Sequence, residues 1–252
     1  MNTKVIKYLK DLSVSKTSKI LLAVSGGIDS MVLMDMLYRH GYNISIAHCN
    51  FCLRGKESDE DKLFVEKISF KYKKQFYSKE FTTKEYSIQN KISFQMAARV
   101  LRYEWFDLLK EKYDFDFICT AHHHDDSVET FLINLIRGTG ISGLHGIKGI
   151  VCSLIRPMSM CSKKDIIDYA NKYGIIYRED SSNKDDKYVR NKIRNKIIPL
   201  MQEINPRVLD AIGNTISRVS DVESIYQKLV SEKKKNYCKN HMMNLQLISL
   251  HF

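Results

Sequence analysis

A short buried strand, a glycine turn and a helix follow one another near the start of this 252-residue chain. Residues 19–24 read KILLAV, an apolar run whose length suits a strand that is buried on both faces of a sheet. The run stops at Gly26 and Gly27, and helical spacing of apolar residues then continues to Gly41, a residue type favoured directly after a helix. Because strands buried on both faces belong to parallel sheets covered by helices, this unit predicts an α/β fold.

Alternating strands and helices are expected along most of the remaining chain. Further strands are predicted at residues 44–48, 75–81, 115–121 and 150–155, and further helices at 58–73, from 93 onward, at 127–137 and at 162–174. The expected N-terminal caps are Ser58 with Asp61, Ser93, and Ser162 with Asp165. About five such repeats imply a parallel, doubly wound sheet, with ligands at the carboxyl ends of its strands.

The pattern changes after about residue 180. Residues 188–200 and 207–235 read as helices without intervening strands. We therefore expect two domains, an α/β domain at residues 1–185 and a C-terminal helical appendage at residues 186–252.

The first helix of this appendage has two different faces. Its inward face is expected to consist of three apolar residues, Val189, Ile193 and Ile197. Its other face carries a basic stripe of Lys187, Arg190 and Arg194. Such a stripe is either a solvated surface or a grip on RNA phosphates, and a grip on phosphates would weaken as the salt concentration rises.

The overall charge agrees with a polyanionic partner. Forty Lys and Arg against 29 Asp and Glu give a net charge of +11, a balance that attracts nucleic acid. Apolar runs of about five residues fall far short of the ~20 that span a bilayer, so no membrane segment is expected. The N-terminal residues lack a signal-peptide block, and the six cysteines are irregularly spaced, which favours free thiols and a cytoplasmic location.

The turn between the first strand and the first helix can bind an anion. Glycines there let the backbone approach a ligand, so the turn amides and those of the helix N-terminus can converge on a phosphate. Asp29 would repel that phosphate unless a cation such as Mg²⁺ lay between them. No GxxxxGK[ST] motif occurs, so the turn is not a Walker A loop; an ordinary turn with a capping Asp is the alternative. The candidate nucleotide-binding residues are Ser25, Gly26, Gly27, Ile28, Asp29 and Ser30.

Several segments together resemble a known family. SGGIDS resembles the signature of the PP-loop ATP pyrophosphatase superfamily, whose members cleave ATP to AMP and pyrophosphate while activating a carbonyl oxygen. Over about residues 18–200, further segments narrow the resemblance to the tRNA(Ile)-lysidine synthetase family: HCNFCLRGKES at 48–58, AARVLRYEW at 97–105, AHHHDDSVET at 121–130, DSSN at 180–183 and RNKIR at 190–194. The resemblance implies an adenine nucleotide alpha hydrolase-like fold whose first domain binds ATP and Mg²⁺.

The reaction that this resemblance implies is a C–N bond-forming ligation. ATP adenylates the oxygen of the wobble cytidine in a tRNA(Ile) with a CAU anticodon, pyrophosphate leaves, and AMP leaves when the amine of free L-lysine attacks to form lysidine. The helical appendage would then be a truncated tRNA-binding region, and a homodimer is one option for the oligomeric state. Two alternatives stay open: a PP-loop tRNA thiolase that needs Cys49 and Cys52, and a non-catalytic nucleotide- or RNA-binding module.

The fourth strand is followed by histidines and carboxylates. His122 and its two neighbours lack the spacing and the fourth ligand of a zinc site. Asp125 and Glu129 lie one helical turn apart, so they can share a face. Only about one lysine amine in 2,500 is neutral at pH 7, so a nearby base is needed. Asp29 and Asp126 are expected to hold Mg²⁺, Asp125 and Asp126 to bind lysine or take its proton, and His122 or His123 to act as a base or phosphate donor. These roles are not separated, and the acidic residues at 125, 126 and 129 could instead simply cap the helix.

Arginines supply the remaining candidates. Arg99 and Arg102 lie at positions i and i+3 of a long helix, where they can reach one anion or form surface ion pairs; the resemblance implies that they hold ATP or RNA at the reactive centre. The candidate RNA-binding residues are Lys187, Arg190, Asn191 and Arg194. A formal GxGxxG at residues 138–143 follows a helix, so the dinucleotide-binding interpretation is discarded.

Overall fold

The computed structural model describes residues 1–53, 55–179 and 189–249, with side chains described up to residue 234. It divides into two compact units. We call Met1–Ser127 with Ile147–Asp185 the sheet unit, and Val128–Gly146 with Asp186–Phe252 the helical unit. Within the described ranges, no helix has both the length and the apolar character needed to cross a bilayer.

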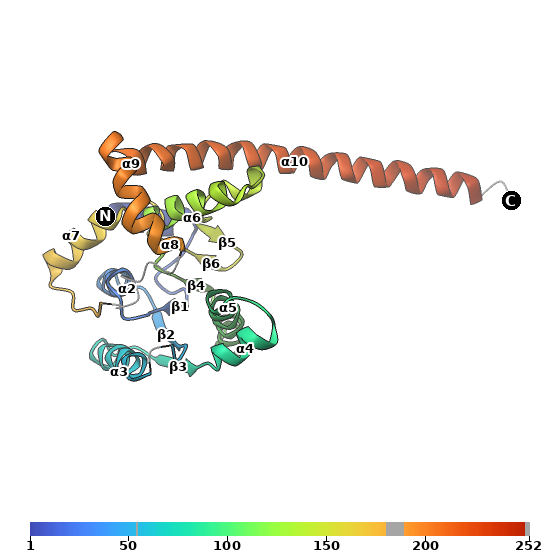
Figure 1. Ribbon diagram of the computed structural model, residues 1–252. Coiled ribbons are helices and arrows are strands. Elements are labelled where there is room, and N and C mark those ends of the chain that lie inside the picture. The colour runs from blue at the N-terminus through green and yellow to red at the C-terminus, as the bar shows by residue number, and fades with distance from the viewer. Residues whose placement is uncertain (54, 180–188, 250–252) are drawn as a thin grey trace. The chain divides into compact units, whose positions relative to one another are not determined.

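The sheet unit contains one six-stranded sheet in the order β3-β2-β1-β4-β6-β5 (Figure 1). Leu22 of β1 lies opposite Ile46 of β2 and Cys119 of β4, and both pairings are parallel. The chain moves outward from β1 to β3 and then returns to place β4 on the other side of β1, so the order reverses between β1 and β4. Ligands bind at such a reversal in open α/β sheets. The strands are β1 (Ile20–Ala23), β2 (Ile44–Asn50), β3 (Phe76–Glu80), β4 (Phe117–Cys119), β5 (Ile150–Val151) and β6 (Leu154–Ile155).

The predicted doubly wound α/β fold is confirmed, with one correction at its edge. Residues 150–155 were expected to form one strand, but they form a hairpin in which β5 pairs antiparallel with β6. Cys152 lies at the turn with a φ of +52°. The prediction was wrong there because a reversal at a non-glycine residue leaves no turn signal in the sequence.

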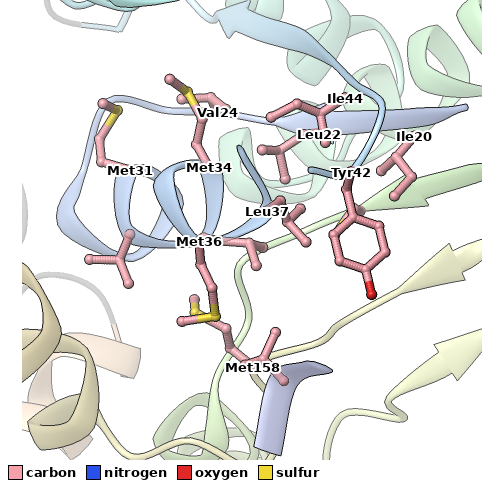
Figure 2. Packing of buried hydrophobic residues seen from close by; sticks show 14 of the residues in the cluster. Ile20, Leu22, Val24, Met31, Met34, Met36, Leu37, Tyr42, Ile44 and Met158 are labelled. Atoms are coloured by element: carbon pink, nitrogen blue, oxygen red, sulfur yellow. The ribbon is translucent and has the colours of Figure 1, made fainter. Parts of the chain in front are cut away.

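Helices cover both faces of this sheet because strand residues alternate in direction. On β1, Ile20 and Leu22 enter a core with α1 (Asn2–Asp11), α2 (Ile28–Arg39), α3 (Lys56–Lys71) and α7 (Lys163–Tyr173). Figure 2 shows Met31, Met34 and Met36 of α2 among the residues of this core. Leu21 enters a second core with α5 (Phe94–Tyr113), against which α4 (Thr83–Gln89) packs. Neither α1 nor α4 was predicted.

Helix ends follow the local signals in most places. Ser93 caps α5 by accepting a hydrogen bond from the Met96 amide, and Ser162 with Asp165 forms a capping box on α7, as predicted. Gly174 ends α7 in the left-handed conformation. The predicted cap at Ser58 was wrong, because α3 begins at Lys56 after Gly55 and Ser58 lies buried inside the helix.

The helical unit begins within α6 (His124–Arg137) and continues through η1 (Ile141–Gly143), α8 (Val189–Lys192), the π-helix η3 (Ile193–Ile197), α9 (Ile198–Ile204) and α10 (Val208–Ser249). Its core includes Ile193 and Ile198, whereas Val189 and Ile197 are exposed. The expected inward face was wrong at those two positions because the wider π-helical turn shifts which residues face inward. Since η1 follows α6, residues 138–143 do follow a helix.

Candidate active site

The turn after β1 has the backbone geometry of an anion-binding loop. Gly26 has a φ of +95°, which side chains disfavour, and Gly27 is the N-cap of α2. The first bond within α2 joins the Met31 amide to the Gly27 carbonyl at 3.1 Å. Because the amides of the first helical turn precede that bond, they have no intrahelical acceptor. Ile28, the first residue of α2, contributes its amide to this turn and packs its side chain against the core.

The two serines of the loop stabilise its shape. The Ser30 hydroxyl donates to the Gly27 carbonyl at 2.9 Å and accepts from the Ser25 amide at 3.2 Å. The Gly27 amide donates to the Ser25 hydroxyl at 3.3 Å. Both hydroxyls therefore form bonds within the loop, and a bound phosphate would have to share these groups.

A second contact fixes the loop from the segment after α7. The Arg178 amide donates to the Gly26 carbonyl at 3.0 Å. The Arg178 guanidinium bonds Asp61 at 2.5 Å and Glu60 at 2.9 Å, both on α3. No local signal in the sequence indicates this contact, since Arg178 lies far along the chain from the residues that it joins.

Asp29 lies in the first turn of α2, where the helix dipole favours a carboxylate. Its Oδ1 is 2.5 Å from Nζ of Lys163, the first residue of α7, and 3.8 Å from Nε2 of His123. Asp29 and Lys163 are each about one-third exposed. Lys163 was not among the predicted site residues, because nothing in the sequence places the start of α7 beside the first turn of α2.

His123 joins Asp29 to a second carboxylate. Its backbone amide donates to Asp126 Oδ2 at 3.0 Å, and its Nε2 is 3.6 Å from the same oxygen. Asp29 and Asp126 therefore flank one imidazole nitrogen. The ring is buried, and its Nδ1 has no hydrogen-bond partner among the described residues. The sequence leaves His122 and His123 as alternatives for the base or phosphate donor, since three consecutive histidines do not show which one turns inward.

Asp125 and Asp126 lie in the first turn of α6, which begins at His124 and not at about Ser127 as predicted. The predicted start was late because Asp126 itself bonds the amide of His123 and so caps the helix. Asp125 Oδ2 accepts from the Lys163 amide at 3.4 Å. The starts of α6 and α7 thus meet at the carboxyl edge of the sheet.

The remaining predicted residues of the sheet unit are His122, Arg99 and Arg102. His122 follows β4 and shares a 2.9 Å hydrogen bond between its Nδ1 and the Thr120 hydroxyl. The Arg99 guanidinium lies over the Tyr103 ring at 5.0 Å, and the Arg102 guanidinium lies over the Phe51 ring at 5.1 Å. Stacking uses the guanidinium face and leaves N–H groups at its edge for an anion.

The thiol of Cys49 is a poor nucleophile in this environment. Burial raises the pKa of Cys49 to about 12, although Arg102 lowers it in part. A thiol is reactive as the thiolate, which a raised pKa disfavours. The side chain of Cys52 is exposed, and its backbone has a φ of +53°. The five cysteines whose side chains are described are free, as predicted for them.

The helical unit contains a separate carboxylate–arginine cluster. Glu129 is 1% exposed and accepts two bonds from Arg194, at 2.6 Å from Nε and 3.0 Å from Nη2. Nε of Arg190 is 3.5 Å from Glu129, and its Nη2 donates to the Thr130 hydroxyl at 2.9 Å. Asn191 is buried, and Lys187 lies outside the described residues.

The sequence of this chain is similar to those of known proteins. A family model described as a PP-loop domain matches residues 1–201. A tRNA(Ile)-lysidine synthase of Bacteroides thetaiotaomicron is 44% identical over 232 residues, which are 92% of this chain and 54% of that protein. A tRNA(Ile)-lysidine synthase of Petrotoga mobilis is 41% identical over 209 residues, which are 81% of this chain and 67% of that protein.

One solved structure illustrates the shared fold. The U34-tRNA thiolase NcsA from Methanococcus maripaludis matches with a TM-score of 0.70 and 19% identity, covering 86% of this chain and 76% of that chain. At this identity the likeness concerns the fold alone. The chain spans about half the length of the first curated relatives. With the family model covering most of the chain and a relative matched over two-thirds of its own length, the chain belongs to the PP-loop family and, within it, to the tRNA(Ile)-lysidine synthases.

Proposed function

We propose that this chain ligates L-lysine to the wobble cytidine of a tRNA(Ile) with a CAU anticodon. The reaction forms lysidine through an adenylated cytidine and releases AMP and pyrophosphate. Membership in the PP-loop family implies ATP as the nucleotide, and the names of the relatives supply the tRNA. The observation that carries the proposal is the convergence of the β1–α2 turn, Asp29, Lys163 and Asp126 at one edge of the sheet.

ATP phosphates are proposed to lie against the loop at residues 25–30. The glycine backbone and the first-turn amides of α2 provide donors, and the helix dipole favours the negative charge. The Lys163 ammonium adds a positive charge at the same end of α2. Arg99 and Arg102 are proposed to hold ATP or the RNA through the edges of their guanidinium groups.

The chemistry of Asp29 and Asp126 fits Mg²⁺. Among the residues that the structure describes, no group of three or more His, Cys, Asp or Glu side chains could hold a metal. Mg²⁺ needs no such group, because it often binds one or two carboxylates together with substrate phosphates and water. Asp29 and Asp126 would hold this ion, which would supply positive charge between the carboxylates and the phosphates.

The attacking lysine amine must lose a proton before it can react. Asp125 and Asp126, in the first turn of α6, are proposed to bind the ammonium group and accept that proton. His122, at the end of β4, is proposed as a base or phosphate donor. Removing the proton from the amine costs roughly 4.6 kcal/mol at pH 7. A base that accepts the proton offsets part of this cost.

The positive charge of the chain supports an RNA substrate. Arg190, Asn191 and Arg194 are proposed to contact tRNA from the helical unit, together with Lys187. Arg190 and Arg194 are both more than one-third exposed despite their contacts with Glu129, so their outer N–H groups can reach phosphates. The division at residues 185 and 186, the cytoplasmic location and the oligomeric state stay predictions.

The deciding experiment incubates the 252-residue chain with ATP, Mg²⁺, labelled lysine and the CAU-anticodon tRNA. Label should enter this tRNA and not a tRNA with another anticodon, and pyrophosphate should form in proportion. Failure of the label to enter an intact CAU-anticodon tRNA, with folded protein that binds ATP, would refute the ligase. A non-catalytic module would bind ATP or RNA without releasing pyrophosphate.

A further inference from the structure

A buried carboxylate on α2 lies outside the candidate active site. Asp35 is 2% exposed and accepts three hydrogen bonds. The donors are Nε of Arg39 at 2.6 Å, the Tyr72 hydroxyl at 3.0 Å and the Tyr169 hydroxyl at 3.0 Å. Arg39 belongs to α2 itself, Tyr72 is the C-cap of α3, and Tyr169 belongs to α7. One carboxylate therefore joins three helices.

The protonation of these groups fits this direction of donation. Burial, and then the hydrogen bond to Asp35, raise the pKa of Tyr72 to about 12. The same two causes raise the pKa of Tyr169. Both tyrosines thus stay neutral and donate, while the Arg39 guanidinium compensates the carboxylate charge. Arg39 also lies over the ring of Tyr173, at 4.8 Å, which adds a second contact with α7.

Two contacts join α2 to α7 in the same register. Asp29 meets Lys163 and Asp35 meets Tyr169, and each pair is separated by 134 residues in the sequence. The two contacts are therefore six residues apart on α2 and six residues apart on α7, which is about 9 Å along each helix axis. Because α2 and α7 pack against each other, the buried contact between Asp35 and Tyr169 constrains the partly exposed contact between Asp29 and Lys163.

We propose that Asp35 is a positioning residue that holds α7 in register with α2, so that the Lys163 ammonium meets Asp29 beside the phosphate loop. A shift of α7 by one residue would move Lys163 by about 1.5 Å along the helix and turn it by about 100°. Such a shift would break the 2.5 Å contact with Asp29. The effect on ATP rests on the proposed function of the loop.

Two tyrosine substitutions provide a matched test. Tyr169→Phe removes the 3.0 Å bond from α7 to Asp35, and Tyr72→Phe removes a bond of the same length from the C-cap of α3. Both should lower the melting temperature to a similar extent, because each deletes one hydroxyl from the same carboxylate. Tyr169→Phe alone should weaken ATP binding, about tenfold by calorimetry, and raise the KM for ATP more than it lowers kcat. Asp35→Asn is less suitable, since it also breaks the Arg39 ion pair and can unfold the chain.

The effect must pass through Lys163, and a double-mutant cycle checks this route. In a Lys163→Met background, adding Tyr169→Phe should leave ATP affinity unchanged within about twofold. Additive losses, or equal weakening of ATP binding by Tyr72→Phe and Tyr169→Phe, would overturn the proposal.

A readout without nucleotide separates this proposal from the proposed function. Amide hydrogen exchange in the first turn of α7 should accelerate in Tyr169→Phe and stay as in the wild type in Tyr72→Phe. If the wild type fails to bind ATP while this contrast appears, the nucleotide site is wrong and the register proposal stands. If the wild type binds ATP and both variants exchange alike, the register proposal is wrong and the nucleotide site stands.

Discussion

The two units each hold a carboxylate beside a cation, but the two clusters are built differently. In the sheet unit, Asp29 and Lys163 are both about one-third exposed and touch through one short contact. In the helical unit, Glu129 is 1% exposed, is bonded by two nitrogens of Arg194 and also contacts Arg190. A partly exposed pair costs little to separate, whereas a buried carboxylate that loses its partner is strongly destabilising.

This difference separates an exchangeable contact from a permanent one. A ligand can take the place of either member of the Asp29–Lys163 pair, since water already reaches both groups. The Glu129 cluster fastens α6 to η3 within the helical unit, and breaking it would leave the carboxylate buried without a bidentate partner. The Asp29 and Arg194 predictions test this contrast, and two predictions on Cys49 follow in order of decreasing expected effect.

Replacing Asp29 should affect catalysis and leave stability almost unchanged. We expect Asp29→Asn to lower lysidine formation by about a thousandfold, because the proposed metal ligand loses its charge. The unfolding free energy should change by less than about 1 kcal/mol. Tritiated-lysine incorporation and urea denaturation measure the two quantities. Glu80→Gln, which removes a comparable exposed pair with Lys62, is the control and should keep full activity. A large loss of stability in Asp29→Asn would contradict the contrast.

Replacing Arg194, in contrast, should lower the stability of the chain strongly. Arg194→Met removes both short bonds from the buried Glu129, so the chain should lose about 3 kcal/mol of stability in urea denaturation followed by circular dichroism. Arg190→Met, which removes a longer contact, should cost less than half as much. If both variants lost the same small amount, Glu129 would be no more permanent than Asp29.

Alkaline pH should weaken the sheet unit through Cys49. The folded pKa of Cys49 is raised from 9.0 to about 12, so the thiol ionises first in the unfolded chain. This contribution to stability is complete below pH 9 and is lost as the pH rises from about 9 towards about 12. Between pH 8 and pH 10 the loss should be about 1 kcal/mol.

The measurement compares the wild type with Cys49→Ala under reducing conditions. Urea denaturation followed by Trp105 fluorescence reports on the core against which Cys49 packs, and Trp105 is the single tryptophan of the chain. The variant should lose less stability than the wild type over this pH interval. Equal losses would mean that the thiol is not protected from ionisation.

The smallest effect is expected from removing the partly buried thiol of Cys49 and the exposed thiol of Cys52 together. Cys49→Ser with Cys52→Ser should keep lysidine formation within about threefold of the wild type, because the raised pKa of Cys49 disfavours thiolate chemistry. Lysine incorporation measures the result. Abolished activity in a folded double variant would favour the thiolase alternative.

Local signals in the sequence predicted much of the sheet unit. The KILLAV run, the glycine turn and the capping box at Ser162 each depend on neighbouring residues, and the structure has a strand, a turn and a helix start at those places. The amphipathic helix α1 was not predicted, because its frequent lysines obscure the period of Val5 and Leu9. The hairpin at Cys152 was missed because no glycine marks it.

The candidate site was predicted in its turn and its carboxylates but not in its cross-links. Lys163 reaches Asp29 across 134 residues of sequence, and Arg178 reaches α3 across more than a hundred. Neither contact leaves a periodic pattern, since each depends on how α7 packs on the sheet. Tertiary packing, which a single sequence does not display, therefore decided these parts of the site.

The contact between the Arg178 amide and the Gly26 carbonyl has a consequence for synthesis on the ribosome. The glycine turn is translated early, but its last constraint arrives about 150 residues later along a chain made at roughly 5–20 residues per second. In a nascent chain that carries β1 and α2, the loop therefore lacks its bond from the Arg178 amide for several seconds. The loop acquires its final shape when the segment after α7 leaves the exit tunnel.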